Sequence, residues 1–169
     1  MNAKAVIFSL AMIAQISCAE EPTGNLNCEL DNPALQAMPP GEVTFIKANG
    51  ERLDIDVKLA DQTNTRAAGF QKVCASTVVK TPILFVFEAE ITPAFHMRNV
   101  VTPLDIAFVT RRGTIDSIYT MKTYVLGSNQ RPLYRSKGPV VAALEVAPGF
   151  YAQHGIDNAA QMEWRRVTD

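Results

Sequence analysis

Four polar side chains lie in or beside strand-like apolar runs, where they could form a site: His96, Arg98, Asp105 and Glu145. Glu145 interrupts the apolar run 140–146, and a carboxylate drawn toward an apolar site must be paired or have its pKa raised. Glycoside hydrolysis needs one protonated and one ionised acid across a cleft. If the strand that carries His96 and Arg98 pairs near Asp105 and near Glu145, the two carboxylates, the imidazole and the guanidinium converge at one rim of a sheet. The candidate cleft comprises His96, Arg98, Asn99, Asp105 and Glu145.

A structural interpretation of the same residues is favoured over catalysis. An ion pair of Arg98 with Asp105 or with Glu145 would fix strand register, and Asp105 would cap a turn after Pro103. Ion-pair networks perturb charges without any catalysis. The sequence therefore predicts a non-catalytic binding or accessory module, whose ligand is an unspecified small molecule, glycan or envelope protein. The alternative is an envelope hydrolase that uses Asp105 and Glu145, with carbohydrate as the candidate substrate class.

Other common chemistries lack their local signatures. His96 and His154 are the only histidines, and neither has a metal-ligand spacing, so we predict no metal and no cofactor. Phosphate-cradling loops, dinucleotide fingerprints and nucleophile elbows are also missing from the sequence. Sixteen basic residues against seventeen acidic ones give a net charge of −1, which argues against a nucleic-acid partner.

The elements that must position these residues are mainly short strands. The chain has 169 residues, of which 47% are hydrophobic and 20% charged, so one domain is expected. Residues 43–47 and 53–59 alternate apolar with polar, and Asn49-Gly50 predicts a two-residue hairpin turn between them. Asp61 is expected to cap a helix over 62–68, and a one-turn helix is expected within 148–155. Further strands are predicted at 83–87, 94–98, 106–109, 114–119, 140–146 and 161–167.

This pattern predicts a mainly β fold, a compact β-sandwich or flattened barrel with one or two short helices. In the run 94–98, alternation places Phe95 and Met97 toward the core and the side chains of His96 and Arg98 on the other face.

The N-terminal residues predict export. A single lysine precedes the apolar run 5–14, which is typical of a signal peptide over 1–19 and too short for a transmembrane helix. Cleavage after Ala19 would release a soluble protein, while lipid attachment at Cys18 is the alternative. Residues 20–42 are acidic and rich in proline, which predicts a flexible linker before a single domain over 43–169. In an oxidising compartment, Cys28 and Cys74 are expected to form a disulfide.

Several segments together resemble the domain of unknown function 192 family, in its order and spacing over about 52–167. The segments are Gly69, Leu84-Phe85-Val86-Phe87, Phe95-His96-Met97-Arg98-Asn99, Pro103-Leu104-Asp105-Ile106-Ala107-Phe108-Val109, Gly113-Thr114-Ile115 and Leu144-Glu145-Val146. The resemblance implies a compact, mostly β fold, frequent export and no established activity.

The chain also departs from the family's pattern. The family usually has Trp at the position of His96, Lys at Arg98, Thr at Val100 and Gly-Met at Pro82-Ile83, and its Gly-Asp before the last strand is missing around 158–159. The first change replaces a large amphipathic ring with one that titrates near neutral pH, so the role of the Trp cannot be transferred to His96.

Overall fold

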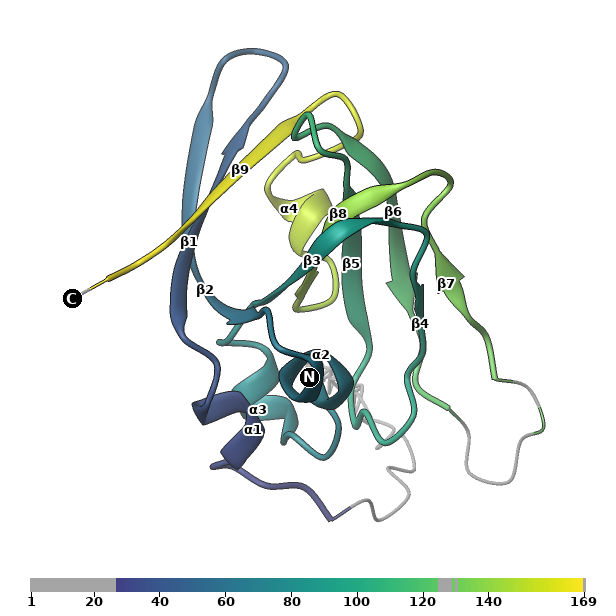
Figure 1. Ribbon diagram of the computed structural model, residues 1–169. Coiled ribbons are helices and arrows are strands. Elements are labelled where there is room, and N and C mark those ends of the chain that lie inside the picture. The colour runs from purple at the N-terminus through teal and green to yellow at the C-terminus, as the bar shows by residue number, and fades with distance from the viewer. Residues whose placement is uncertain (1–26, 125–128, 130, 169) are drawn as a thin grey trace, which may run out of the picture.

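A computed structural model describes residues 27–124, 129 and 131–168, and it shows a mainly β domain (Figure 1). Its seven-stranded sheet has the order β6-β5-β8-β3-β2-β1-β9. The strands are β1 (Pro40–Ile46), β2 (Arg52–Ala60), β3 (Ile83–Ile91), β5 (Leu104–Val109), β6 (Ile115–Met121), β8 (Val140–Val146) and β9 (Gln161–Arg166). Neighbouring strands are antiparallel, except that β2 and β3 run parallel.

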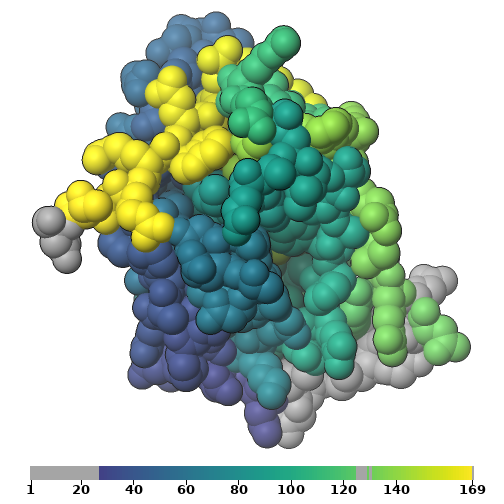
Figure 2. All heavy atoms as spheres, in the orientation of Figure 1, coloured from purple at the N-terminus to yellow at the C-terminus, as the bar shows by residue number. Residues whose placement is uncertain are grey.

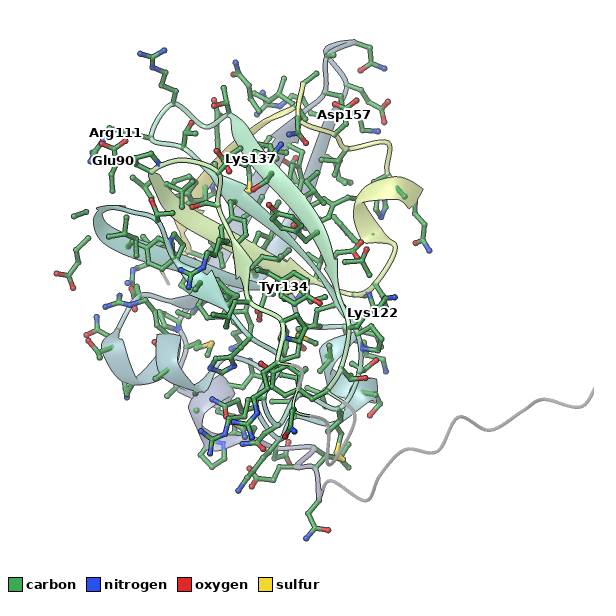
Figure 3. All side chains as sticks on the ribbon, turned by 90° about the vertical axis from the view of Figure 1, so that its right-hand side faces the viewer. Glu90, Arg111, Lys122, Tyr134, Lys137 and Asp157 are labelled. Carbon is green, nitrogen blue, oxygen red and sulfur yellow. A yellow bond between two sulfur atoms is a disulfide. The ribbon has the colours of Figure 1, made fainter. Side chains whose placement is uncertain are left out.

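A second, two-stranded sheet pairs β4 (Ala94–Phe95) with β7 (Tyr134–Arg135). Two contacts fasten the periphery of the large sheet, and the residues that make them are labelled in Figure 3. The Tyr134 hydroxyl oxygen accepts a hydrogen bond of 3.0 Å from the Lys122 backbone N–H, which ties β7 to the end of β6. The Arg111 side chain lies 3.5 Å from the Glu90 carboxylate, which links the turn after β5 to the end of β3.

Hydrophobic clusters cover both faces of the large sheet. One cluster packs Leu35, Phe70 and Val78, from in or near α1 (Pro33–Gln36), α2 (Thr63–Ala68) and α3 (Ala75–Val78), against one face. The other cluster packs Tyr151 of α4 (Phe150–Gln153) against the opposite face. Every residue of β5 and of β8 is buried, because these central strands are covered on both sides.

The two ends of the sheet approach each other without closing it into a barrel. Thr114 and Gln161 form an isolated bridge, and the Met162 N–H donates to the Gly113 carbonyl at 2.7 Å. Gly113 has a φ of 79°, and a Cβ there would stand 2.8 Å from the Met162 oxygen, so this close approach requires glycine. In the space-filling view the yellow C-terminal strand lies over the blue β1–β2 hairpin (Figure 2). The mainly β prediction is confirmed, with an open sheet and four short helices in the described residues.

The predicted hairpin is confirmed, but its turn is longer than predicted. Ile46 pairs with Arg52, and Lys47 N–H donates to the Glu51 carbonyl at 2.9 Å, which leaves three residues in the loop. Only Gly50 has a positive φ, as expected for a three-residue loop that ends in a left-handed residue. The Asn49 side chain instead accepts a hydrogen bond from the Glu51 N–H at 2.9 Å.

The sequence predicted that Asp61 caps α2, and this prediction is wrong. The helix is capped at Gln62, whose N–H donates to the Thr65 hydroxyl at 3.1 Å. The Asp61 carboxylate is instead paired with Arg166 of β9. The interaction with a strand from the far end of the chain therefore replaces the predicted local cap.

The strand predicted over 94–98 is shorter in the structure, where it comprises only Ala94–Phe95. The chain then turns, and Asn99 adopts a φ of 57°. The predicted alternation nevertheless holds, because Met97 is buried while His96 and Arg98 are exposed.

Part of the predicted linker 20–42 is folded. Asn32 caps α1, since its Oδ1 accepts hydrogen bonds from Ala34 N–H and Leu35 N–H at 3.1 and 3.2 Å. Leu35 and Met38 are buried, and β1 already begins at Pro40. The boundary predicted at residue 43 is therefore wrong, because these residues bury apolar side chains. The predicted signal peptide and Cys18 lie outside the described residues, within which no helix has the length and apolar character to cross a membrane.

A disulfide joins Cys28 to Cys74, as predicted, with 4.8 Å between the two Cα atoms. Backbone hydrogen bonds flank it, from Glu29 N–H to the Lys72 carbonyl at 2.7 Å and from Cys74 N–H to the Glu29 carbonyl at 3.2 Å. The N-terminal segment is thus fastened beside the turn that follows α2.

Candidate functional site

A pocket of about 360 Å³ lies between α2, the turn that follows it, and the strands β3 and β4. Its walls are mostly apolar, and four phenylalanines contribute to them: Phe70, Phe85, Phe87 and Phe95. Ala67 of α2 and His96 after β4 line the pocket while being exposed, so they mark its mouth. Such a concave, mainly apolar site with few polar groups is typical of small-molecule binding.

Glu145 is the buried acid of this pocket. It lies on β8, directly opposite Ile83 of β3 and Ile106 of β5, and it is only 5% exposed. In the described part of the chain its carboxyl group has neither a hydrogen-bond partner nor an ion-pair partner. Burial without compensation raises the pKa of Glu145 to about 8. The group is therefore mostly protonated at neutral pH.

Gly69 keeps the approach to this carboxyl group free. It follows α2 with a φ of 48°, and it lines the pocket. A Cβ at this position would lie 3.3 Å from Phe85 Cζ and 4.0 Å from Glu145 Oε2. Any side chain here would therefore fill space next to the carboxyl group.

Two other polar residues of the pocket wall are already engaged. The Arg66 guanidinium donates to the carbonyls of Asp61 and Val86 at 2.5 and 3.2 Å. The Gln71 side chain donates to the Ala67 carbonyl at 2.8 Å and accepts from Asn99 Nδ2 at 3.1 Å. Neither is free to neutralise or solvate Glu145, so its carboxyl group remains available to a ligand.

Asp105 does not share this pocket, which corrects the predicted convergence of the two acids. Antiparallel partners that stand directly opposite point to the same face. Asp105 pairs with Val146, whereas Glu145 pairs with Ile106, so the two carboxyl groups lie on opposite faces of the sheet. Asp105 Oδ1 accepts from the Thr120 hydroxyl and Oδ2 from the Gly149 N–H, both at 2.8 Å. It holds the turn before α4 in place.

The remaining residues of the predicted cleft are divided between different surroundings. His96 lines the pocket, and its Nδ1 accepts a hydrogen bond from the Arg98 N–H at 3.3 Å. Asn99 supports the wall through Gln71. Arg98 is exposed and pairs with neither Asp105 nor Glu145, so the predicted ion pairs are not formed. Among the described residues no three His, Cys, Asp or Glu side chains gather as a metal site would require.

Sequence reasoning missed the phenylalanine walls and the role of Gly69. These residues come from three separate segments, at 69–70, 85–87 and 95, which only the fold brings together. His96 lies at the mouth of the pocket, at a position where the domain of unknown function 192 family usually has Trp.

The fold and the site define a mainly β domain with an open seven-stranded sheet, a small two-stranded sheet and an apolar pocket lined by a buried acid. The chain belongs to the DUF192 family, described as Uncharacterized ACR, whose model matches residues 44–164. Comparison with curated proteins gave no significant match.

Two solved structures are similar to the chain. One, from Sinorhizobium meliloti 1021, is described as a candidate transcription regulator; it is 26% identical with a TM-score of 0.65, over 75% of this chain and 95% of that one. The other is a protein of unknown function from Novosphingobium aromaticivorans DSM 12444; it is 25% identical with a TM-score of 0.64, over 79% of this chain and 99% of that one.

Proposed function

We propose that the protein is a non-catalytic binding module that takes a small molecule with an apolar body into the pocket beside Glu145. The observation that carries the proposal is Glu145, a residue only 5% exposed whose carboxyl group has no bonding partner among the described residues and lines an apolar pocket with an exposed mouth. An unpartnered buried polar group is costly, and a ligand that bonds to it would remove that cost.

The hydrolase alternative is less favoured. A glycosidase needs its two carboxyl groups on either side of one bond. Asp105 and Glu145 lie on opposite faces of the sheet, and both Asp105 oxygens are occupied by hydrogen bonds. Regulation of transcription, stated for one structural neighbour, is not carried over either, since a net charge of −1 supplies no excess of cations for phosphates.

Ala67→Trp is expected to abolish binding of small molecules without unfolding the protein. Ala67 is exposed at the mouth of the pocket, so an indole there would obstruct entry while leaving the core intact. The measurement is a thermal-shift screen of neutral and charged organic fragments against the purified protein, because a ligand of the native state raises the unfolding temperature.

Asn64→Trp is the matched control, because Asn64 is an exposed residue of the same helix that does not line the pocket. Fragments that stabilise the wild type should stabilise this variant equally and lose their effect on Ala67→Trp. A screen without a single stabilising fragment, or fragments that act equally on both variants, would contradict the proposed binding site.

We further propose that the protein is exported to the cell envelope and released in soluble form, with a lipid anchor at Cys18 as the alternative. The apolar run 5–14 and the pairing of Cys28 with Cys74 support this. When the gene is expressed in a Gram-negative host, the mass of the periplasmic protein should correspond to a chain that begins at Glu20 and lacks two hydrogens. A chain that begins at a lipid-modified Cys18 would identify the lipoprotein, and an intact chain in the cytoplasm would refute export.

A further inference from the structure

We propose that the ligand of the pocket is an organic amine, whose ammonium group binds the Glu145 carboxylate while its apolar body lies against the phenylalanine walls. This inference rests on the proposed function, and it names the chemical class of the ligand.

The first argument is the charge of the pocket. Glu145 is the acid among the lining residues, and the guanidinium of the lining residue Arg66 is bound to the Asp61 and Val86 carbonyls and lies 3.8 Å from Glu88. Arg66 and His96 are the lining residues that can carry a positive charge, and neither forms an ion pair with Glu145, so an ionised Glu145 lacks a paired counter-charge among the described residues. A buried carboxylate without a paired counter-charge is strongly unfavourable. A cationic ligand therefore gains more binding free energy here than beside an acid that is already paired.

The second argument is the chemistry of the walls. The four phenylalanines carry no polar group, and the faces of aromatic rings attract cations electrostatically. Phe85 and Phe95 stand nearly perpendicular, at 89°, with 4.9 Å between their ring centres. The carboxylate and the rings can therefore both offset the free energy that an ammonium ion loses when it leaves water. A neutral amide would gain such compensation from the carboxyl group alone.

Binding of an amine is coupled to release of a proton. The free pocket holds a proton on Glu145 at neutral pH, because burial raises its pKa to about 8. An ammonium ion binds the ionised form, so the proton passes from the carboxyl group to the buffer. The affinity for an amine should therefore rise with pH until Glu145 is ionised in the free protein, by roughly tenfold per pH unit well below its pKa.

Isothermal titration calorimetry with three probes of equal chain length tests the inference: hexylamine, hexanamide and hexanoate. For hexylamine, which stays protonated from pH 6 to 9, the Kd should fall about tenfold between pH 6 and 7 and level off above pH 8. Titrations at pH 6.5 in buffers with different ionisation enthalpies should show release of about one proton. Hexanamide and hexanoate should bind at least tenfold more weakly at pH 9.

Glu145→Gln should remove both the pH dependence and the proton release, and should weaken hexylamine at pH 9 at least tenfold. Glu163→Gln makes the same change at an exposed acid of β9 outside the pocket, and should leave binding unchanged. Urea unfolding of both variants verifies that they fold.

Three other outcomes would overturn the amine assignment, and they differ in which probes bind. If hexanamide bound more tightly than hexylamine, and its binding weakened above pH 8, the pocket would use the protonated acid. The proposed binding function would then stand. Failure of hexylamine to bind, while other fragments depend on Ala67, would exclude amines but keep the pocket. Failure of all fragments would refute the proposed function itself.

Discussion

Glu145→Gln is expected to change how stability depends on pH more than any other single substitution. Burial raises the pKa of Glu145 to about 8 from an ordinary value of 4.5. The unfolded chain therefore loses this proton at a lower pH than the folded one, and the wild type loses stability as pH rises from about 4.5 to about 8. The Gln variant has no such proton, so its advantage over the wild type should grow by about 5 kcal/mol between pH 4 and pH 9.

Urea unfolding of both proteins at pH 4, 6, 7.5 and 9 measures this difference. Comparing variant with wild type at each pH cancels the titration of all other groups. Glu163→Gln serves as the control, because its exposed acid should give a curve nearly parallel to that of the wild type. Parallel curves for Glu145→Gln as well would show that Glu145 is solvated or paired in the folded protein.

Removal of the disulfide is expected to have the second largest effect. Cys28 and Cys74 are 46 residues apart, and the bridge restricts the unfolded chain by closing this loop. The double variant Cys28→Ser/Cys74→Ser should lower the free energy of unfolding by about 4 kcal/mol.

Urea unfolding at pH 6 under non-reducing conditions gives the measurement, and the wild type with excess reductant provides an independent comparison. Both should show the same loss, because each lacks the bridge. A double variant as stable as the oxidised wild type would mean that the segment around Cys28 contributes nothing to stability through its link to Cys74.

The sequence predicted strands well where one face of the strand meets water. Leu53, Ile55 and Val57 alternate with acids, and β2 is found there with the expected faces. The sequence could not show which residues of β5 and β8 face which side of the sheet. Every residue in both strands is buried, so their burial does not alternate along the strand. That is why Asp105 and Glu145 were expected together. A shift of one residue in the register between two such strands moves a side chain to the other face.

The short helices show a second limit. The Asn32-Pro33 pair is a recognised start of a helix, and it could have located α1 inside the predicted linker. The pocket had no comparable signal, since Gly69, Phe85 and Phe95 are ordinary residues of a helix end and of two strands. What makes them a site is that α2 lies against β3 and β4 over Glu145, and this depends on tertiary packing.

The way in which the large sheet ends bears on self-association. Open strand edges are templates on which other chains add strands and aggregate. At one edge, the start of β6 is bridged to β9 through Thr114 and Gln161. At the other, β9 carries the exposed charges of Glu163, Arg165 and Arg166, which disfavour an incoming apolar strand. The folded protein should therefore stay dispersed at high concentration, and fibril formation should require its prior unfolding.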